Sequence, residues 1–78
     1  MAIYIEIEKL SEDDDGAEYT FASTEGNGGT LRLNKRSGLT QLVMSKGDPE
    51  QRLYGRAAHK VRVAWEGGTC PDRLVWAS

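Results

Sequence analysis

Cysteine and histidine are scarce in this chain. Its 78 residues include one cysteine, Cys70, and one histidine, His59. A lone cysteine excludes an intrachain disulfide and favours a reducing compartment, and a zinc site of His and Cys ligands needs more of both residues. A nucleophilic pair of Cys70 and His59 requires the C-terminal tail to fold back beside the residues around position 59. We therefore predict a protein that is not an enzyme and that has no metal or cofactor.

Long apolar runs are also missing. The longest is Met1 to Ile5, whereas a membrane-spanning helix needs roughly 20 apolar residues. No basic segment followed by an apolar one opens the chain, so the sequence predicts no signal peptide. We expect a single domain over residues 1–78 that is cytoplasmic, has no membrane contact and, because the chain is short, buries only a small core.

Charge is unevenly distributed along the chain. The net charge of −2 is the sum of −7 for residues 1–28 (eight acids, one base), +6 for residues 29–63 (eight bases, two acids) and −1 for residues 64–78 (two acids, one base). One interpretation is a basic face for an anionic partner. The other is that the two oppositely charged regions neutralise each other across neighbouring strands.

Apolar and polar residues alternate through the first half of the chain, which is the pattern of strands with one buried face. The clearest case is Ile3, Ile5 and Ile7, which alternate with polar or acidic residues. In the next strands, Tyr19 and Phe21 share one face, and Leu31 and Leu33 point inward. We expect an antiparallel sheet over about residues 2–45, with strands near 3–8, 18–24, 30–34 and 39–45.

Glycines mark the turns between these strands. Asn27-Gly28 has the composition that supplies positive φ angles in a tight hairpin. Lys35 to Gly38 resembles a type I turn that ends in a left-handed glycine bulge. The inward face of the fourth strand stays open, because Leu42 and Met44 compete with Val43 for it and a bulge shifts the alternation by one residue.

Two loops look like ligand-binding motifs but fit turns better. If Gly16 is placed sixth in an EF-hand calcium loop, Ala22 falls at the twelfth position, where a bidentate acid is required. The glycines of Gly26 to Gly29 precede a predicted strand, whereas a phosphate-binding glycine loop precedes a helix. We therefore interpret Asp13 to Gly16 as a solvated acidic connection and Gly26 to Gly29 as a hairpin turn.

After Asp48 the apolar period changes from two to that of a helix, which we expect over about residues 49–66. Signals for both ends are present: Asp48 as N-cap, Pro49 at the first helical position, Glu50 in the first turn, Gln51 three residues after the cap as in a capping box, and Gly67-Gly68 as a left-handed stop. Gly55 falls in the helix interior, where it costs roughly 1 kcal/mol relative to alanine.

The predicted helix has an apolar and a basic face at 100° per residue. The apolar face holds Leu53, Tyr54, Ala57, Ala58, Val61, Ala64 and Trp65. The outer face holds Arg52, Arg56, His59, Lys60 and Arg62, with Val63 among them. We predict an α+β fold of two layers, a four-stranded antiparallel meander covered by one amphipathic helix. Residues 69–78 form a fifth, edge strand or an extended tail, because Trp76 is too large to leave in water.

The basic outer face is the strongest candidate binding surface, formed by Arg52, Arg56, His59, Lys60 and Arg62. We predict a small protein-interaction module of unknown partner that uses this face, a sheet edge or both, and that is a monomer or a homodimer through a sheet edge. The alternative is weak, sequence-nonspecific nucleic-acid binding through the same residues. Support for that alternative is limited, because Tyr4, the aromatic expected on the outer sheet face, neighbours Glu6 and Glu8, which repel phosphate.

Overall fold

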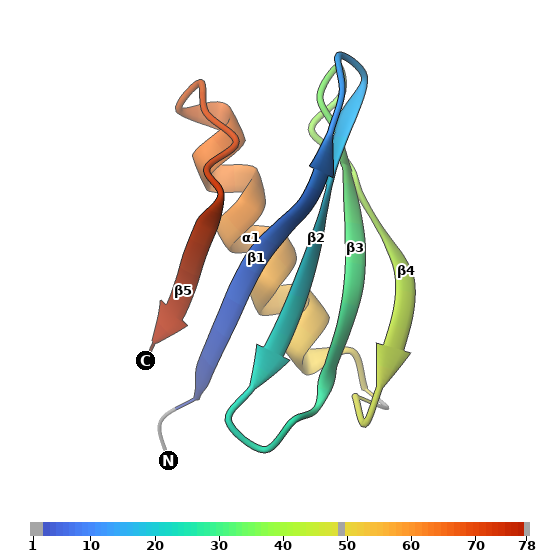
Figure 1. Cartoon of the computed structure of the whole chain (residues 1–78), viewed down its shortest axis with the longest axis vertical. Coiled ribbons are helices and arrows are strands. Elements are labelled where there is room, and N and C mark those ends of the chain that lie inside the picture. The colour runs from blue at the N-terminus through green and yellow to red at the C-terminus, as the bar shows by residue number, and fades with distance from the viewer. Residues whose placement is uncertain (1–2, 49, 78) are drawn as a thin grey trace.

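Five strands form one antiparallel sheet, and a single helix covers one of its faces (Figure 1). This computed structural model describes residues 3–48 and 50–77. The fold confirms the predicted two-layer α+β architecture. The elements are β1 (Tyr4–Glu12), β2 (Gly16–Ser23), β3 (Gly28–Asn34), β4 (Thr40–Lys46), α1 (Arg52–Glu66) and β5 (Arg73–Ala77).

The strand order is β4-β3-β2-β1-β5, so the first four strands form the predicted meander and the C-terminal segment is an edge strand. In Figure 1 α1 runs behind the sheet, from the end of β4 towards the start of β5. This connection carries the chain from one edge of the sheet to the other. β5 then pairs antiparallel with β1, in a register that joins Ile5 to Trp76 and Ile7 to Leu74.

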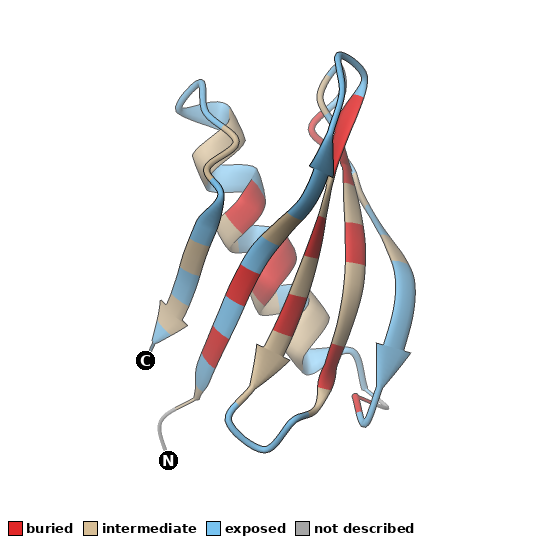
Figure 2. Cartoon of the chain, in the orientation of Figure 1, coloured by how far each residue is buried: buried red, intermediate tan, exposed pale blue. Residues whose placement is uncertain are grey.

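The core lies between the sheet and α1, and the alternation in β1 to β3 produces it. Figure 2 shows buried and exposed positions alternating along β1. The predicted inward residues of these strands are buried except Ile3, which lies before β1 and is partly buried against the core, and α1 adds three of its own residues. The buried hydrophobic side chains are Ile5, Ile7, Ala17, Tyr19, Phe21, Leu31, Leu33, Ala57, Ala58 and Val61. Small alanines at the contact let the helix approach the sheet closely.

The start of α1 differs from the prediction. The helix begins at Arg52, and Gln51 precedes it in the left-handed region, at φ 55° and ψ 31°. The capping box is wrong, because the Gln51 side chain makes no cap hydrogen bond. Asp48 still has a capping function, since its carboxylate accepts hydrogen bonds from the backbone N–H groups of Leu53 (3.1 Å) and Tyr54 (3.0 Å). The predicted position of Pro49 lies outside the described residues.

The backbone conformation of Gln51 explains how Asp48 caps a helix that begins at Arg52. The left-handed Gln51 reverses the chain locally, which lets a carboxylate three residues earlier reach the free N–H groups of the first turn. Glu50 consequently stands before the helix and not in its first turn. At the other end, Gly68 has φ 94°, and the N–H groups of Gly68 and Thr69 donate to the carbonyl oxygens of Trp65 (2.9 Å) and Ala64 (3.1 Å). This is a Schellman motif, and it confirms the predicted stop.

One of the two predicted glycine turns is wrong in detail. In the β2–β3 hairpin the positive φ belongs to Gly26 (85°), and Asn27 and Gly28 have none. The Gly26 N–H donates to the Ser23 carbonyl oxygen, and the Ser23 N–H donates to that of Asn27, so the reversal comes one residue before the Asn-Gly pair. The β3–β4 turn follows the prediction, with Gly38 at φ 76°.

A bulge in β4 determines which of its residues face the core, a question that the sequence alone leaves open. The register passes from Thr30 opposite Met44 to Leu31 opposite Leu42, which leaves Val43 as the extra residue. Leu42 packs against the core, whereas Val43 is 55% and Met44 61% exposed. Because a bulge shifts the alternation by one position, two consecutive apolar residues are exposed on this edge strand.

Candidate interaction surfaces

The predicted basic face of α1 is divided into residues with and without a counter-charge. Arg52 forms an ion pair with Glu50 (Nη2 to Oε2, 2.6 Å). Arg62 forms one with Glu66, four residues along the helix (Nε to Oε1, 3.2 Å). Both arginines are exposed, so each pair contributes little to stability. These pairs do lower the positive charge that either arginine offers to a partner.

Arg56 and Lys60 have no acidic partner within residues 3–48 and 50–77. One Arg56 Nη1 hydrogen donates to the carbonyl oxygen of Arg52 (3.1 Å). Both side chains are half-buried, so their aliphatic stems cover the surface beside them and their charged heads reach solvent. They are four residues apart and therefore lie on the same side of the helix. They form the unpaired part of the basic face.

The contacts of His59 identify the side of α1 that lies next to β5. Its ring meets the indole of Trp76 in β5 edge to face, with centroids 6.1 Å apart and an interplanar angle of 79°. α1 also packs against β5 through other contacts. Arg56 and Val63 lie one turn before and one turn after His59. We define the β5 flank as Arg56, His59, Lys60, Val63 and Trp76, that is, the Trp76 ring of β5, the His59 ring that meets it and three residues of α1 within one turn of His59.

The indole nitrogen of Trp76 is in an unusual environment. This Nε1 atom is buried and has no hydrogen-bond acceptor among the described residues. A buried donor without an acceptor costs about 1–3 kcal/mol. The packing of the Trp76 ring against His59 and the core offsets part of this cost.

The two sheet edges differ in how they present their backbone. β4 carries the bulge at Val43, a feature that twists an edge and hinders its pairing with another strand. β5 pairs with β1 over Arg73 to Ala77 without any register shift. The Lys9 N–H donates to the Asp72 carbonyl oxygen at 2.9 Å. By the alternation of an antiparallel ladder, the backbone N–H and C=O groups of Leu74 and Trp76 then point towards β1.

It follows that Arg73, Val75 and Ala77 turn their backbone N–H and C=O groups away from the sheet. The Val75 side chain is 40% exposed. The Arg73 side chain pairs with Glu8 at 3.1 Å, so it is fixed along the sheet. β5 is thus a regular edge strand, and its Trp76 contacts His59, which lies within one turn of the unpaired cations of α1.

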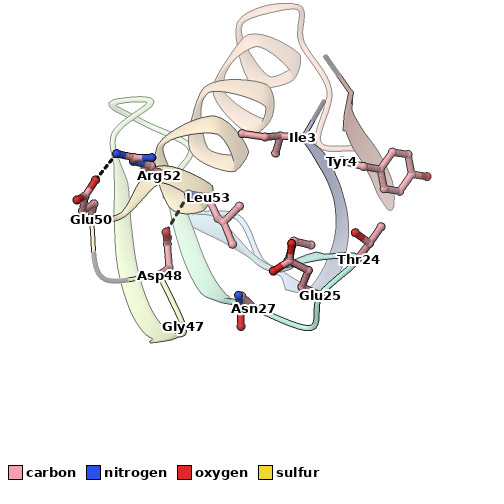
Figure 3. Close-up of a pocket in the computed structure, with 11 residues that line it drawn as sticks. Ile3, Tyr4, Thr24, Glu25, Asn27, Gly47, Asp48, Glu50, Arg52 and Leu53 are labelled. Carbon is pink, nitrogen blue, oxygen red and sulfur yellow. Dashed lines mark hydrogen bonds and ion pairs between the residues drawn. The ribbon is translucent and has the colours of Figure 1, made fainter. Parts of the chain in front are cut away.

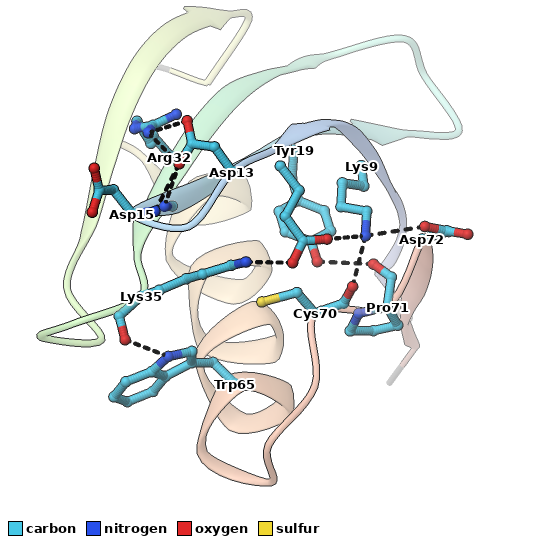
Figure 4. Close-up of polar contacts among 12 residues, drawn as sticks. Lys9, Asp13, Asp15, Tyr19, Arg32, Lys35, Trp65, Cys70, Pro71 and Asp72 are labelled. Atoms are coloured by element: carbon cyan, nitrogen blue, oxygen red, sulfur yellow. Dashed lines mark hydrogen bonds and ion pairs between the residues drawn. The ribbon is translucent and has the colours of Figure 1, made fainter.

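A polar cluster ties the segment before β5 to the sheet (Figure 4). The Lys9 ammonium contacts Glu12, the Asp72 carboxylate (3.1 Å) and the carbonyl oxygen of Cys70 (2.9 Å). Glu12 also pairs with Lys35. Hydrogen bonds from Lys35 and Lys9 lower the pKa of the Glu12 carboxyl, and hydrogen bonds to Glu12 and Asp72 raise the pKa of Lys9.

Two aromatic side chains complete this end of the molecule. The Tyr19 hydroxyl donates to the carbonyl oxygen of Pro71 (2.8 Å), and the Trp65 indole N–H donates to that of Lys35 (2.8 Å). Burial raises the pKa of Tyr19 to about 12. Cys70 lies in this cluster (Figure 4), whereas the His59 ring meets Trp76 edge to face. The tail does fold back beside the helix, but it places the cysteine and the histidine among different neighbours.

A groove of about 570 Å³ lies between the β2–β3 hairpin and the start of α1 (Figure 3). Ile3 and Leu53 give it apolar walls, and Glu25 and Asn27 stand on its rim. Asp48 already accepts hydrogen bonds from the helix N–H groups there. The positive end of the helix dipole is therefore occupied by the protein's own carboxylate and offers no anion site.

The acidic connection between β1 and β2 also uses its own carboxylate. Asp13 Oδ1 accepts from the N–H groups of Asp15 (2.9 Å) and Gly16 (2.8 Å), and these bonds lower the pKa of Asp13. Arg32 reaches the same side chain at 3.3 Å. In the described part of the chain, no group of three or more His, Cys, Asp or Glu side chains is arranged to hold a metal ion.

The basic residues of α1 were predicted from the sequence, whereas Trp76 was not predicted to belong to the same surface. The i,i+4 spacing of Arg62 and Glu66 would have indicated that this arginine is paired. No helix in residues 3–48 and 50–77 is long and apolar enough to cross a membrane. Comparison of the chain with protein families, with curated proteins and with solved structures gives no match.

Proposed function

We propose that this chain is a protein-interaction module that binds its partner at the edge of β5 and the adjoining β5 flank. The observation that supports it best is the juxtaposition of two unsatisfied features. One is the row of outward backbone groups on Arg73, Val75 and Ala77. The other is the pair of cations, Arg56 and Lys60, that have no acidic partner in the described chain. A sheet edge supplies main-chain hydrogen bonds to a partner, and neighbouring side chains supply selectivity.

The β4 edge is a weaker choice for the same role. Its exposed Val43 and Met44 offer more apolar surface than β5 does. However, the bulge at Val43 interrupts the regular spacing of backbone groups that an added strand requires. Its nearest basic neighbour on the strand is the exposed Lys46, a charge of the kind that protects edges from pairing.

The experiment is an NMR comparison of the ¹⁵N-labelled chain alone and in an extract of its source cells. We expect signal changes confined to β5 and to residues 56–63 of α1. Val75→Pro is the decisive variant, because proline removes an outward N–H without removing a bond to β1, and prolines are tolerated on edge strands. The variant should keep the fold and lose the signal changes. Changes confined to β4, or changes that survive in Val75→Pro, would contradict the proposal.

Nucleic-acid binding through α1 is a second candidate, which Arg56 and Lys60 also favour. Of the arginines and lysine of α1, Arg56 and Lys60 are the two without an acidic partner in the described residues, so the logarithm of the affinity should fall with the logarithm of salt concentration with a slope of about −2. Val75→Pro separates the two functions, because a phosphate backbone makes no use of the β5 edge. An oligonucleotide that binds the variant as well as the original chain would favour this second function.

A further inference from the structure

We infer that the partner segment is an extended, acidic strand that adds to β5 and places carboxylates on the β5 flank. This inference rests on the proposed function and specifies the chemistry of its partner. An added strand must be extended, because its backbone has to follow the outward groups of Arg73, Val75 and Ala77. The five-residue length of β5 limits the ladder to a short segment of the partner.

The two faces of β5 differ, and an added strand would meet both of them. Leu74 and Trp76 share the face that α1 covers, and both pack against the core. Val75 lies between them on the open face. Successive residues of the partner therefore point alternately towards α1 and towards the open face of the sheet. Only the residues that point towards α1 come near the cations of the β5 flank.

The charges on this side of the molecule favour a carboxylate there. Arg56 and Lys60 have no acidic partner in residues 3–48 and 50–77, and their half-buried stems hold them near the surface. Two acids beside the start of β5 already have counter-charges, since Asp72 pairs with Lys9 (3.1 Å) and Glu8 with Arg73 (3.1 Å). A partner with carboxylates at alternate positions would supply the missing counter-charges, and one with lysines would be repelled.

The test uses two synthetic peptides of about eight residues, one of alternating glutamate and threonine and one of alternating lysine and threonine. Each is titrated into the ¹⁵N-labelled chain at about 20 mM and about 200 mM salt. We expect shifts at β5 and at residues 56–63 with the glutamate peptide, weaker at high salt, and none with the lysine peptide. In Arg56→Ala/Lys60→Ala the affinity should fall roughly ten-fold, as two exposed ion pairs are lost.

Arg52→Ala/Arg62→Ala is the matched control, because it removes the same net charge from residues that already pair with Glu50 and Glu66. It should change the affinity less than about two-fold. Equal losses in both double variants would overturn the inference, since they would show attraction by net charge alone.

Equal binding of the two peptides at β5 would also overturn it, and would leave the proposed edge function intact. Binding of the glutamate peptide that survives Val75→Pro would overturn strand addition itself, and with it the proposed function. An oligonucleotide that gives the same shifts at α1 but none at β5 would assign the cations to phosphate and contradict the acidic strand.

Discussion

The Tyr19 hydroxyl donates a 2.8 Å hydrogen bond to the carbonyl oxygen of Pro71, a residue 52 positions further along the chain. Tyr19 is fully buried in the middle of the sheet, and Pro71 precedes β5. The bond therefore fixes the segment that leads from α1 to the edge strand. The position of the proposed binding edge depends on this contact and on the Lys9 bond to the Cys70 carbonyl oxygen.

Tyr19→Phe should destabilise the fold at neutral pH and reduce its loss of stability in alkali. Removing the hydroxyl leaves the Pro71 carbonyl without its donor, which costs about 1 kcal/mol. Because the pKa of Tyr19 is raised from 10.0 to about 12, the folded state keeps a proton that the unfolded state releases over this range. Tyrosine ionisation thus lowers stability as pH rises from about 10 to 12, and phenylalanine lacks that contribution.

Thermal unfolding between about pH 8 and 11 measures both effects. Lys9 and Lys35 also have raised pKa values, so alkali still weakens the variant, although less than the original chain. Tyr4→Phe is the control, since Tyr4 is 42% exposed. If the melting temperatures of Tyr19→Phe and the original chain stayed a constant distance apart across the alkaline range, the linkage to Tyr19 would be refuted.

Gly38→Ala should cost more stability than Gly26→Ala. Both glycines have positive φ, 76° for Gly38 and 85° for Gly26, so alanine pays a left-handed penalty of roughly 1–2 kcal/mol at either position. A Cβ at Gly26 meets nothing within 4 Å, whereas one at Gly38 overlaps the ring of Trp65. Displacing this ring also strains its hydrogen bond to Lys35, and overpacking of this kind adds at least about 1 kcal/mol.

Urea titration of the two variants, followed by tryptophan fluorescence, gives the comparison. Equal free energies of unfolding for Gly38→Ala and Gly26→Ala would mean that the Trp65 ring moves aside without cost. That result would contradict the close packing of the β3–β4 turn against α1.

The fold could be predicted from sequence wherever a local pattern determines it. Alternation in β1 to β3 identifies the inward residues, and the change of period at Asp48 identifies the helix. The bulge at Val43 could not be predicted, because it depends on how β4 pairs with β3. The left-handed Gln51 was not predicted, because an N-cap signal at Asp48 indicates that the helix starts at the next residue. In the structure the Asp48 carboxylate reaches past three residues to the N–H groups of the first turn.

The candidate site was predictable in part for the same reason. Periodicity places Arg52, Arg56 and Lys60 outside the core, but it does not show which of them have a counter-charge. That depends on where Glu50 lies once Gln51 turns the chain. The contact between His59 and Trp76 joins residues 17 positions apart, and it depends on the pairing of β5 with β1.

Glu12→Gln should weaken the fold at neutral pH and lose this effect in acid. Lys35 and Lys9 lower the pKa of Glu12 in the folded state below its usual 4.5. The ionised carboxylate therefore contributes stability above about pH 4.5, and this contribution is lost as pH falls through the lowered pKa. The melting temperatures of Glu12→Gln and the original chain should converge as the pH decreases below this value.

The control is Glu25→Gln, whose carboxylate makes no hydrogen bond or ion pair with the described residues. Its melting temperature should follow that of the original chain at every pH. Asp13 contributes an acid dependence of the same sign, because its pKa is lowered too, so both proteins still lose stability in acid. A constant gap between Glu12→Gln and the original chain from neutral pH into acid would refute the assignment to Glu12.

Gly55→Ala should stabilise the protein and leave its binding surface unchanged. Gly55 is exposed within α1, and a Cβ there meets nothing within 4 Å. Alanine in a helix interior is favoured over glycine by roughly 1 kcal/mol, which corresponds to a rise of about 4–8 °C in melting temperature for a domain of this size. Gly68→Ala is the opposite control, because its φ of 94° penalises alanine at the helix end. If Gly55→Ala were stabilising and also reduced binding of the glutamate peptide, the partner would contact the outer face of α1 beyond the β5 flank.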